Sequence, residues 1–209
     1  LGQVVVGAEL RRFLGGLDRK RRRELGNAAD HRHAAGGDGL RGFDDLQLLG
    51  PRQRGVLAHR AAHHQARDAV AQQAQSDVTT AYTILAGLPC GTDLTGTDLG
   101  TLPALAPGVY CFSTSAQLTG TLTLDAGGDP AAEWIFQIGS TLTPASNSNV
   151  NVINGGSDCT VYWQVGSSAT IGTATSFAGN ILALTSITLT TGASVNGRLL
   201  ARNGAVTLD

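Results

Sequence analysis

The residues of this chain whose types and spacing can carry a function are threonines set at regular intervals. Five short segments place a threonine between mostly apolar neighbours: Leu122-Thr123-Leu124, Leu142-Thr143-Pro144, Ala169-Thr170-Ile171, Ile187-Thr188-Leu189 and Val206-Thr207-Leu208. The central threonines follow one another at steps of 20, 27, 18 and 19 residues. Such a period is typical of a solenoid, in which each repeat forms one coil.

A stacked array of these threonines offers binding chemistry. Side chains alternate across a strand, so the flanking apolar residues point inward and the threonines outward. A second outward column stands two residues earlier: Thr121, Thr141, Ser168, Ser186 and Ala205. Stacked coils would repeat these groups about every 4.7–4.9 Å. Because β-branched threonine is stiff at χ1, a flat face of this kind loses little freedom on binding another periodic surface, of which ice is the obvious one. The competing interpretation is that threonine is simply a good strand residue on a solvated face.

The same half of the chain offers little for catalysis. Residues 68–209 contain no histidine and no lysine. A glycosidase needs two facing carboxylates, and the acids here fall in or near expected turns. Arg198 and Arg202 are the only basic residues available to an active site of the polysaccharide-lyase type. We therefore predict no enzyme activity, no catalytic residue, no metal and no cofactor.

Composition divides the chain sharply near Arg67. Residues 1–67 hold 13 basic and 7 acidic residues, a net charge of +6, and no Ser, Thr, Ile, Tyr, Trp or Cys. Residues 68–209 hold 2 basic and 9 acidic residues, a net charge of −7, with 22 Thr and 12 Ser. The predicted division is a basic segment without an assigned fold at 1–67 and a helix plus solenoid at 68–209.

The basic segment supports two weak functional interpretations. Residues 10–25 read as a basic amphipathic helix, which would suit nucleic acid or an anionic membrane, although most charge runs are solvated or disordered. Five histidines, which include His59 and His63 at helical spacing, lack the cysteines or carboxylates that would complete a metal site. We predict neither nucleic-acid binding nor membrane insertion, and no apolar run reaches the roughly 18 residues of a spanning helix.

The second part opens with a predicted helix over Asp68–Leu85. Its apolar stripe at helical spacing comprises Val70, Ala74, Val78, Ala81, Tyr82 and Leu85. Asp68 is the expected N-cap, and Gly87 with Pro89 ends the helix. Cys90 and Cys111 flank the following loop and are the expected disulfide, which leaves Cys159 free and favours an oxidising compartment.

Two further strand types recur between the threonine segments. Nearly continuous apolar runs predict strands covered on both faces: Val109–Phe112, Trp134–Ile138, Tyr162–Val165, Ile181–Leu184 and Leu199–Leu200. The helix is the element available to cover their outer face. A weaker set comprises Val150–Ile153, Ser176–Ala178 and Ala193–Val195. Three strand types in each coil predict a roughly triangular cross-section.

Residues 68–209 closely resemble the microbial ice-binding (antifreeze) protein family. The resemblance rests on stretches such as DAVAQQAQSDVTTAY, LAPGVYCFSTSAQLTGTLTLDAGGDP, WIFQIGSTLT and the run VYWQVGSSAT to the C-terminus. It implies a mainly β fold, a right-handed parallel β-solenoid (β-helix) with one long α-helix packed alongside. It also implies a secreted or cell-surface protein whose partner is the ice crystal surface, whose growth and recrystallisation it slows. The alternative is a cell-surface adhesion or carbohydrate-binding solenoid, which a groove with exposed aromatic residues would favour.

The resemblance adds a turn motif of the form T-A/G-x-T/N to the candidate site. Near matches, each ending in serine, are Thr173-Ala174-Thr175-Ser176 and Thr191-Gly192-Ala193-Ser194. Whether these positions or the threonine column bind ice stays open. The complete candidate set is Thr121, Thr123, Thr141, Thr143, Ser168, Thr170, Thr173, Thr175, Ser176, Ser186, Thr188, Thr190, Thr191, Ser194 and Thr207.

The resemblance implies Ser/Thr/Gly-rich strands upstream that close the solenoid, and residues 1–67 do not match them. We hypothesise that this segment is a translation of the wrong reading frame of a GC-rich gene. Back-translated with GC-rich codons and read from the second base, Gly16-Leu17-Asp18 becomes Gly-Ser-Thr. The nucleotide sequence tests this: a shifted frame without family-like text would refute it. If the hypothesis holds, the solenoid keeps an exposed edge that is prone to association.

Overall fold

The computed structural model describes the backbone of residues 51–209 and the side chains of residues 68–209. The predicted basic helix at 10–25 and the histidines of residues 1–67 lie outside this description. The chain separates into two compact units, Leu1–Asp77 and Val78–Asp209, and each is considered by itself. The second unit contains every strand among the described residues and the candidate site.

The first described element is the helix α2, which spans Pro51–Ala86. The prediction that it starts at Asp68 is wrong, because the helix runs without a break through the change in composition. The arginine, alanine and glutamine residues before Asp68 are all good helix formers, so the change in charge does not stop the helix. Its end is confirmed: the Gly87 amide donates to the carbonyl oxygens of Thr83 and Ile84 at 3.0 and 3.2 Å. Within the described part of the chain, no helix is both long and apolar enough to cross a membrane.

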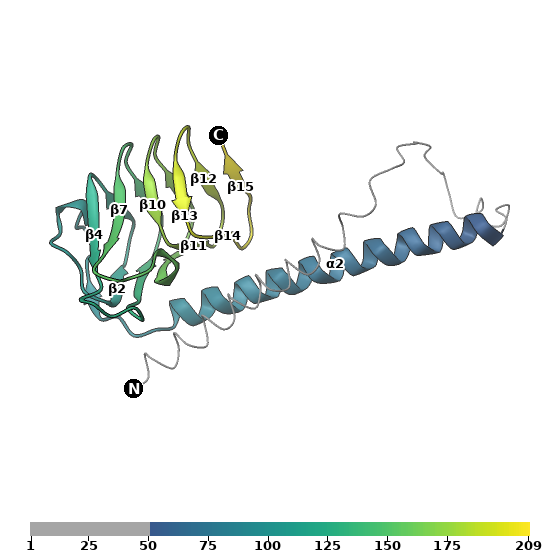
Figure 1. Cartoon of the computed structure of the whole chain (residues 1–209), viewed down its shortest axis with the longest axis horizontal. Helices are drawn as coiled ribbons and strands as arrows, with labels where there is room; N and C mark the ends of the chain where they lie inside the picture. Colours follow the sequence, from purple (N-terminus) through teal and green to yellow (C-terminus); the bar gives the residue numbers. More distant parts are fainter. Residues whose placement is uncertain (1–50) are drawn as a thin grey trace. The chain divides into compact units, whose positions relative to one another are not determined.

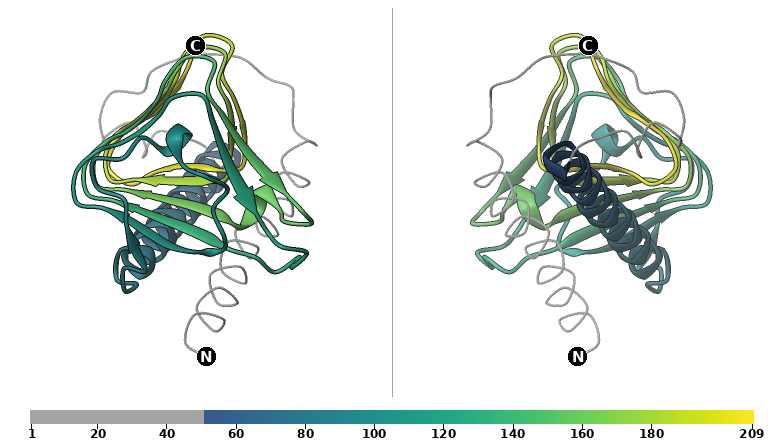
Figure 2. Two further views of the ribbon diagram at one scale, coloured as in Figure 1. Left: turned by 90° about the vertical axis from the view of Figure 1, so that its left-hand side faces the viewer. Right: turned by 90° about the vertical axis from the view of Figure 1, so that its right-hand side faces the viewer.

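Within residues 51–209, fifteen strands form three parallel sheets. These sheets wind into a solenoid (Figure 1). Viewed along its length, the solenoid has a triangular section with one sheet on each side, as predicted (Figure 2). Sheet A contains β1 (Thr92–Asp93), β2 (Gly108–Phe112), β5 (Trp134–Ile138), β8 (Val161–Val165), β11 (Asn180–Ala183) and β14 (Leu199–Ala201). Sheet B contains β3 (Ala116–Leu118), β6 (Leu142–Pro144), β9 (Ala169–Ile171), β12 (Ile187–Leu189) and β15 (Val206–Leu208). Sheet C contains β4 (Thr121–Asp125), β7 (Asn149–Ile153), β10 (Ser176–Ala178) and β13 (Ser194–Asn196).

The predicted strand families match these sheets with one important exception. The continuous apolar runs form sheet A, and the weaker set belongs to sheet C. The segment Leu122-Thr123-Leu124, however, lies in β4 of sheet C, where Thr123 pairs with Asn151. The strand of sheet B in that coil is β3, whose Gln117 pairs with Thr143. The prediction that Thr123 and Thr143 share one column is therefore wrong.

The solenoid interior is filled by apolar side chains with a stack of aromatic rings. Phe136 lies against Trp163 with ring centroids 4.0 Å apart and planes 9° apart. Tyr110 packs on Phe136 and Phe177 packs on Trp163, with ring centroids 5.4 and 4.9 Å apart. The buried Trp163 indole satisfies its N–H by donating to the Ala178 carbonyl at 3.0 Å. Tyr110, Phe136 and Trp163 belong to the paired strands β2, β5 and β8 of three successive coils, so the stack connects these coils through the core.

The last turns of α2 cover the outer face of sheet A. Val78, Ala81, Tyr82 and Leu85 are all buried. The Tyr82 hydroxyl donates to the Val165 carbonyl at 3.4 Å. This confirms the predicted cover only for the C-terminal part of the helix. Val70, in the other unit, is 44 % exposed, so the predicted stripe is not buried along its whole length.

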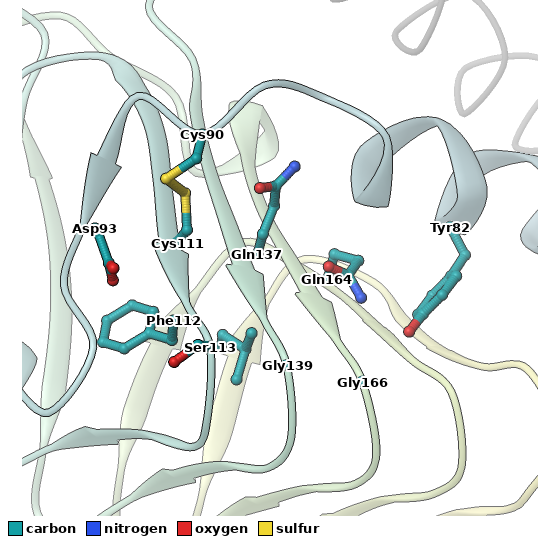
Figure 3. Close-up of a pocket in the computed structure, with 11 residues that line it drawn as sticks. Tyr82, Cys90, Asp93, Cys111, Phe112, Ser113, Gln137, Gly139, Gln164 and Gly166 are labelled. Atoms are coloured by element: carbon teal, nitrogen blue, oxygen red, sulfur yellow. A yellow bond between two sulfur atoms is a disulfide. The ribbon is translucent and has the colours of Figure 1, made fainter.

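Two further hydrogen bonds, both donated by Gln137 (labelled in Figure 3), hold the helix end against the sheet. The outward-facing Gln137 of β5 donates from Nε2 to the carbonyls of Leu85 and Leu88 at 2.7 and 2.8 Å. Leu85 is in the last turn of α2, where carbonyl groups lack partners within the helix, and it also accepts from the Leu88 amide at 3.4 Å. Leu88 follows the end of the helix. The predicted disulfide between Cys90 and Cys111 is present, with Cα atoms 5.8 Å apart, and Cys159 is free and exposed.

One end of the solenoid is closed by the connection that follows the helix. Leu94, Leu99 and Leu105 from this connection are buried against the first coil. The Asp98 carboxylate accepts hydrogen bonds from the amides of Gly100 at 2.9 Å and Thr119 at 2.8 Å. Asp98 therefore ties the closing segment to the turn between β3 and β4.

We predict that this closure weakens in acid. Burial of Asp98 favours its neutral form, but the hydrogen bonds from Thr119 and Gly100 outweigh that effect and lower its pKa. A carboxyl whose pKa is lower in the folded state than in the unfolded state, where it is about 3.9, stabilises the fold fully at pH values above 3.9. This stabilisation is lost as the pH falls through the folded-state pKa. Asp98→Asn should therefore lower the melting temperature at neutral pH and flatten its dependence on pH below about 4. An unchanged acid dependence in the variant would contradict this role.

The opposite end, formed by β13, β14 and β15, is open. These strands pair only with the preceding coil, through β10, β11 and β12. Leu208 is 68 % and Val206 39 % exposed, whereas the residues stacked on them in β12, Leu189 and Ile187, are buried. Among the described residues, nothing covers the apolar interior of this last coil.

Candidate functional site

The candidate site is sheet B, the side of the triangle whose strands carry the threonine segments. Its central outward column runs through Gln117, Thr143, Thr170, Thr188 and Thr207. Thr188 pairs in register with Thr170 on one side and Thr207 on the other. Thr143, Thr170 and Thr207 are exposed, and Thr188 is half-buried. The periodicity thus identified four members of one column correctly.

Two columns flank the central one at the ends of the strands. Their membership follows from the backbone bonds between coils, for example from Leu142 to Ser168 and from Ala169 to Ser186. The column before the strands is Ser115, Thr141, Ser168, Ser186 and Ala205. The column after them is Thr119, Ala145, Gly172, Thr190 and Asp209. Within these columns of described residues, Asp209 at the chain end is the one charged group.

Several hydroxyls of sheet B are held in place by hydrogen bonds between coils. The Thr141 hydroxyl donates to the Ser115 hydroxyl at 2.8 Å. The Thr190 hydroxyl donates to the Ile171 carbonyl at 2.8 Å and lies 3.3 Å from that of Thr173. Together with β-branching, these bonds restrict the rotamers at the edges of the sheet. Sheet B is therefore an ordered array of methyl and hydroxyl groups.

The turn motifs lie at the corner between sheets B and C. Asn147, Ala174 and Gly192 occupy equivalent positions there with φ of 59°, 55° and 70°. This left-handed conformation reverses the direction of the side chain that follows. Thr175 consequently points inward, where it is 1 % exposed and donates to the Ala145 carbonyl at 2.9 Å. The prediction of Thr175 as a contact residue is wrong, whereas Thr173 and Thr191 are exposed at the corner.

The remaining candidate residues belong to sheet C and face a different direction from sheet B. Thr121 pairs with Asn149, which in turn pairs with Ser176, and Ser176 pairs with Ser194. Thr121, Ser176 and Ser194 are exposed. The structure therefore divides the predicted set into a sheet B group, a corner group and a sheet C group.

Sequence reasoning missed Gln117 and Ser115, which are the first members of two columns on sheet B. Neither lies in an apolar–Thr–apolar segment, since β3 reads Ala116-Gln117-Leu118. The alternation of burial in β3 is the same as in β6 and β9. A search for alternation alone, without threonine, would have found it.

A second surface feature lies on sheet A beside the end of α2 (Figure 3). This open hollow of about 480 Å³ is lined by Tyr82, the disulfide, Asp93 and Gln164, among others. Hydrogen bonds from the Thr95 side chain and amide lower the pKa of the Asp93 carboxyl. The hollow thus contains one carboxylate, which is already engaged by Thr95, and the Thr95 hydroxyl also lies 3.2 Å from that of Ser113.

Fold and site together define a triangular β-solenoid that presents a threonine-bearing sheet, on which Asp209 at the end strand is the one charged group of the described columns. The sequence model of the ice-binding-like family matches residues 35–209, and the chain belongs to this family. The match extends upstream of residue 68, so the prediction that residues 1–67 lie wholly outside the family pattern is wrong.

Individual relatives agree with this assignment. The chain is 64% identical over 143 residues to an ice-binding protein of Nostoc sp. strain HG1, an alignment that covers 68% of this chain and 52% of that protein. It resembles the crystal structure of an ice-binding protein of Antarctomyces psychrotrophicus with a TM-score of 0.64 and 40% identity, covering 67% of this chain and 68% of the other. The corresponding domain of ice-binding protein 1 of Shewanella frigidimarina gives a TM-score of 0.63 and 40% identity, covering 67% and 61%. The chain thus spans about half the length of the Nostoc protein.

Proposed function

We propose that this chain binds ice through sheet B and thereby slows ice growth and recrystallisation. The observation that carries the proposal is the in-register threonine column Thr143, Thr170, Thr188 and Thr207, which is exposed apart from the half-buried Thr188 and lies on a face whose described columns carry one charged group, Asp209, at the end. A rigid array of methyl and hydroxyl groups can hold ordered water at the spacing of the strands, and little side-chain freedom is lost on contact. The names of its relatives, which are ice-binding proteins, point to the same ligand.

The choice of sheet B over sheets A and C rests on what each sheet presents. The outer face of sheet A is partly covered by α2, where Tyr82 and Leu85 are buried. Sheet C presents Asn149 and Asn151 beside its hydroxyls, and the Asp125 carboxylate at the end of β4. Charged and amide groups orient water strongly around themselves. On sheet B such groups, Gln117 and Asp209, lie only at the two end strands, whereas on sheet C Asn149 and Asn151 lie in an inner strand, so sheet B offers the more uniform surface. Thr173 and Thr191 border it at the corner and extend the same surface.

We place the protein outside the cell or at its surface. The Cys90–Cys111 disulfide supports this location, because such bonds persist in oxidising compartments. An adhesion role would call for exposed aromatic side chains in a groove, and both tryptophans of the chain, Trp134 and Trp163, are fully buried. The residues of sheet B give no candidate for an enzyme activity.

The experiment that tests the function is ice recrystallisation inhibition together with thermal hysteresis on the purified chain. We expect fine-grained ice to persist and a measurable gap between melting and freezing temperatures. Circular dichroism of the same sample must show the β-rich fold. A folded chain with neither effect would refute ice binding.

A further inference from the structure

We propose that Gln117 is the edge of the ice-binding face of sheet B, and that its side chain alone keeps the first coil out of contact with ice. Contact with ice then begins at Thr143 in β6 and continues along the threonine column. The role of Gln117 rests on the function proposed above, because it assigns to each coil its part in ice binding. The residue lies in β3, next to the end of the solenoid that the segment after α2 closes.

The backbone of β3 is already placed as a further row of the face. Its three residues pair in register with those of β6, so that Gln117 lies beside Thr143. Ala116 and Leu118 are fully buried and Gln117 is exposed, which is the alternation of β6 and β9. The side chain of Gln117 therefore leaves the sheet on the same side as the threonines.

The residues on either side of Gln117 also fit the face. Ser115 stands in the column before the strands, where its hydroxyl accepts from the Thr141 hydroxyl at 2.8 Å. Thr119 stands in the column after the strands and is exposed. The first coil thus presents Ser, Gln and Thr where the coil of β12 presents Ser186, Thr188 and Thr190. The two rows differ in residue type only at the central position.

The charged residue beyond Gln117 is already engaged. Asp98 forms a single bridge with Gln117, after which the chain enters the 3-10 helix η2, Leu99–Thr101. The Asp98 carboxylate accepts from the amides of Gly100 and Thr119 at 2.9 and 2.8 Å. Because these bonds direct the charge of Asp98 to two backbone amides, Gln117 is the group that interrupts the face.

The glutamine side chain is unsuited to a flat contact. It extends further from the backbone than threonine, so it holds its row away from ice unless it folds aside. Within the described part of the chain it has no hydrogen-bond partner that would fix its rotamer. Ordering a glutamine side chain on contact therefore costs conformational entropy, whereas β-branched threonine is stiff at χ1 before contact. The row of β3 thus loses more freedom on contact than the rows of β6, β9 and β12.

The reciprocal substitutions Gln117→Thr and Thr143→Gln test this edge. Gln117→Thr lengthens the threonine column by one row, so the chain concentration needed for recrystallisation inhibition should fall by at least about twofold, since more rows engage ice at once. Thr143→Gln moves the same interruption one row into the face and should raise that concentration by at least about threefold, since fewer rows engage. Both residues are exposed, so neither substitution disturbs the core.

The matched control is Asn151→Thr in β7. It also replaces an exposed amide side chain by threonine, but on sheet C, where Asn151 pairs with Thr123. Any gain that threonine brings through strand propensity or solubility appears in this variant as well. We expect Asn151→Thr to retain the ice activity of the parent. Circular dichroism and the melting temperature of every variant confirm that the comparison is between folded proteins.

Each outcome decides the proposal. A gain in Gln117→Thr, a loss in Thr143→Gln and no change in Asn151→Thr is the expected result. An active parent with no gain in Gln117→Thr, or with no loss in Thr143→Gln, would overturn the edge and leave ice binding itself standing. An equal gain in Asn151→Thr would also overturn it, because the effect would not belong to sheet B. A folded parent without ice activity would remove the proposed function, and the edge with it.

Discussion

Thr188→Tyr should abolish most of the ice activity while leaving the fold intact. Thr188 stands between Thr170 and Thr207 in the central column of sheet B. A tyrosine ring there rises above the plane of its neighbours and holds the sheet away from a flat ice surface. We expect the concentration needed for recrystallisation inhibition to rise by at least about tenfold, which corresponds to about 1.4 kcal/mol of lost binding free energy.

The control for this substitution is Asn151→Tyr in β7. Asn151 is exposed on sheet C and pairs with Thr123, the residue whose segment resembles those of sheet B in sequence. The same ring on this face should leave ice activity within about twofold of the parent. Loss of activity in Asn151→Tyr with full activity in Thr188→Tyr would move the site to sheet C. Equal melting temperatures of the two variants would exclude a general loss of fold.

Trp163→Ala should cause the largest loss of stability of any single substitution considered. The indole is fully buried and stacks on Phe136, with ring centroids 4.0 Å apart. Its other neighbour is the Phe177 ring, whose centroid lies 4.9 Å away. Truncation removes the apolar contacts, leaves a cavity and exposes the Ala178 carbonyl without its donor. Such changes cost about 3–5 kcal/mol. A domain of ordinary stability has only about 5–15 kcal/mol in total, so the variant should be close to unfolding.

Urea denaturation of the parent, Trp163→Ala and Trp163→Phe measures this effect. Trp163→Phe retains a stacked ring and loses mainly the hydrogen bond to Ala178, so it should cost about 1–3 kcal/mol. A loss below about 1 kcal/mol in Trp163→Ala would contradict the role of the aromatic stack as the link between coils. The slope of the denaturation curve shows whether the variant still unfolds as one unit.

The sequence predicted the strands of the solenoid well because the side chains that a strand buries are apolar in the sequence. Runs such as Trp134–Ile138 are apolar on both faces, and they form the sheet that is covered on both faces. Thr143, Thr170, Thr188 and Thr207 were assigned to one column correctly. In each case the residue types of a segment indicate whether its side chains are buried or exposed. This inference requires no information about the neighbouring coil.

The wrong predictions concern residues whose local sequence pattern does not show where in the fold they lie. Leu122-Thr123-Leu124 has the alternation of any half-buried strand, so the pattern cannot show to which side of the triangle it belongs. Thr175 points inward only because Ala174 adopts a left-handed conformation, which alternation along the chain does not reveal. The start of α2 was misplaced because the change in charge near Asp68 was taken for a structural boundary. The helix cap made by Gln137 was missed, since its partners Leu85 and Leu88 are distant in sequence.

The most direct test of the proposed site is adsorption of labelled protein to a single growing ice crystal. The exposed thiol of Cys159 lies after β7, away from sheet B, and accepts a fluorescent dye without disturbing the threonine column. We predict that labelled parent and labelled Asn151→Tyr illuminate the ice, whereas labelled Thr188→Tyr stays in the liquid. Fluorescent ice from Thr188→Tyr at the level of the parent would contradict ice binding through sheet B.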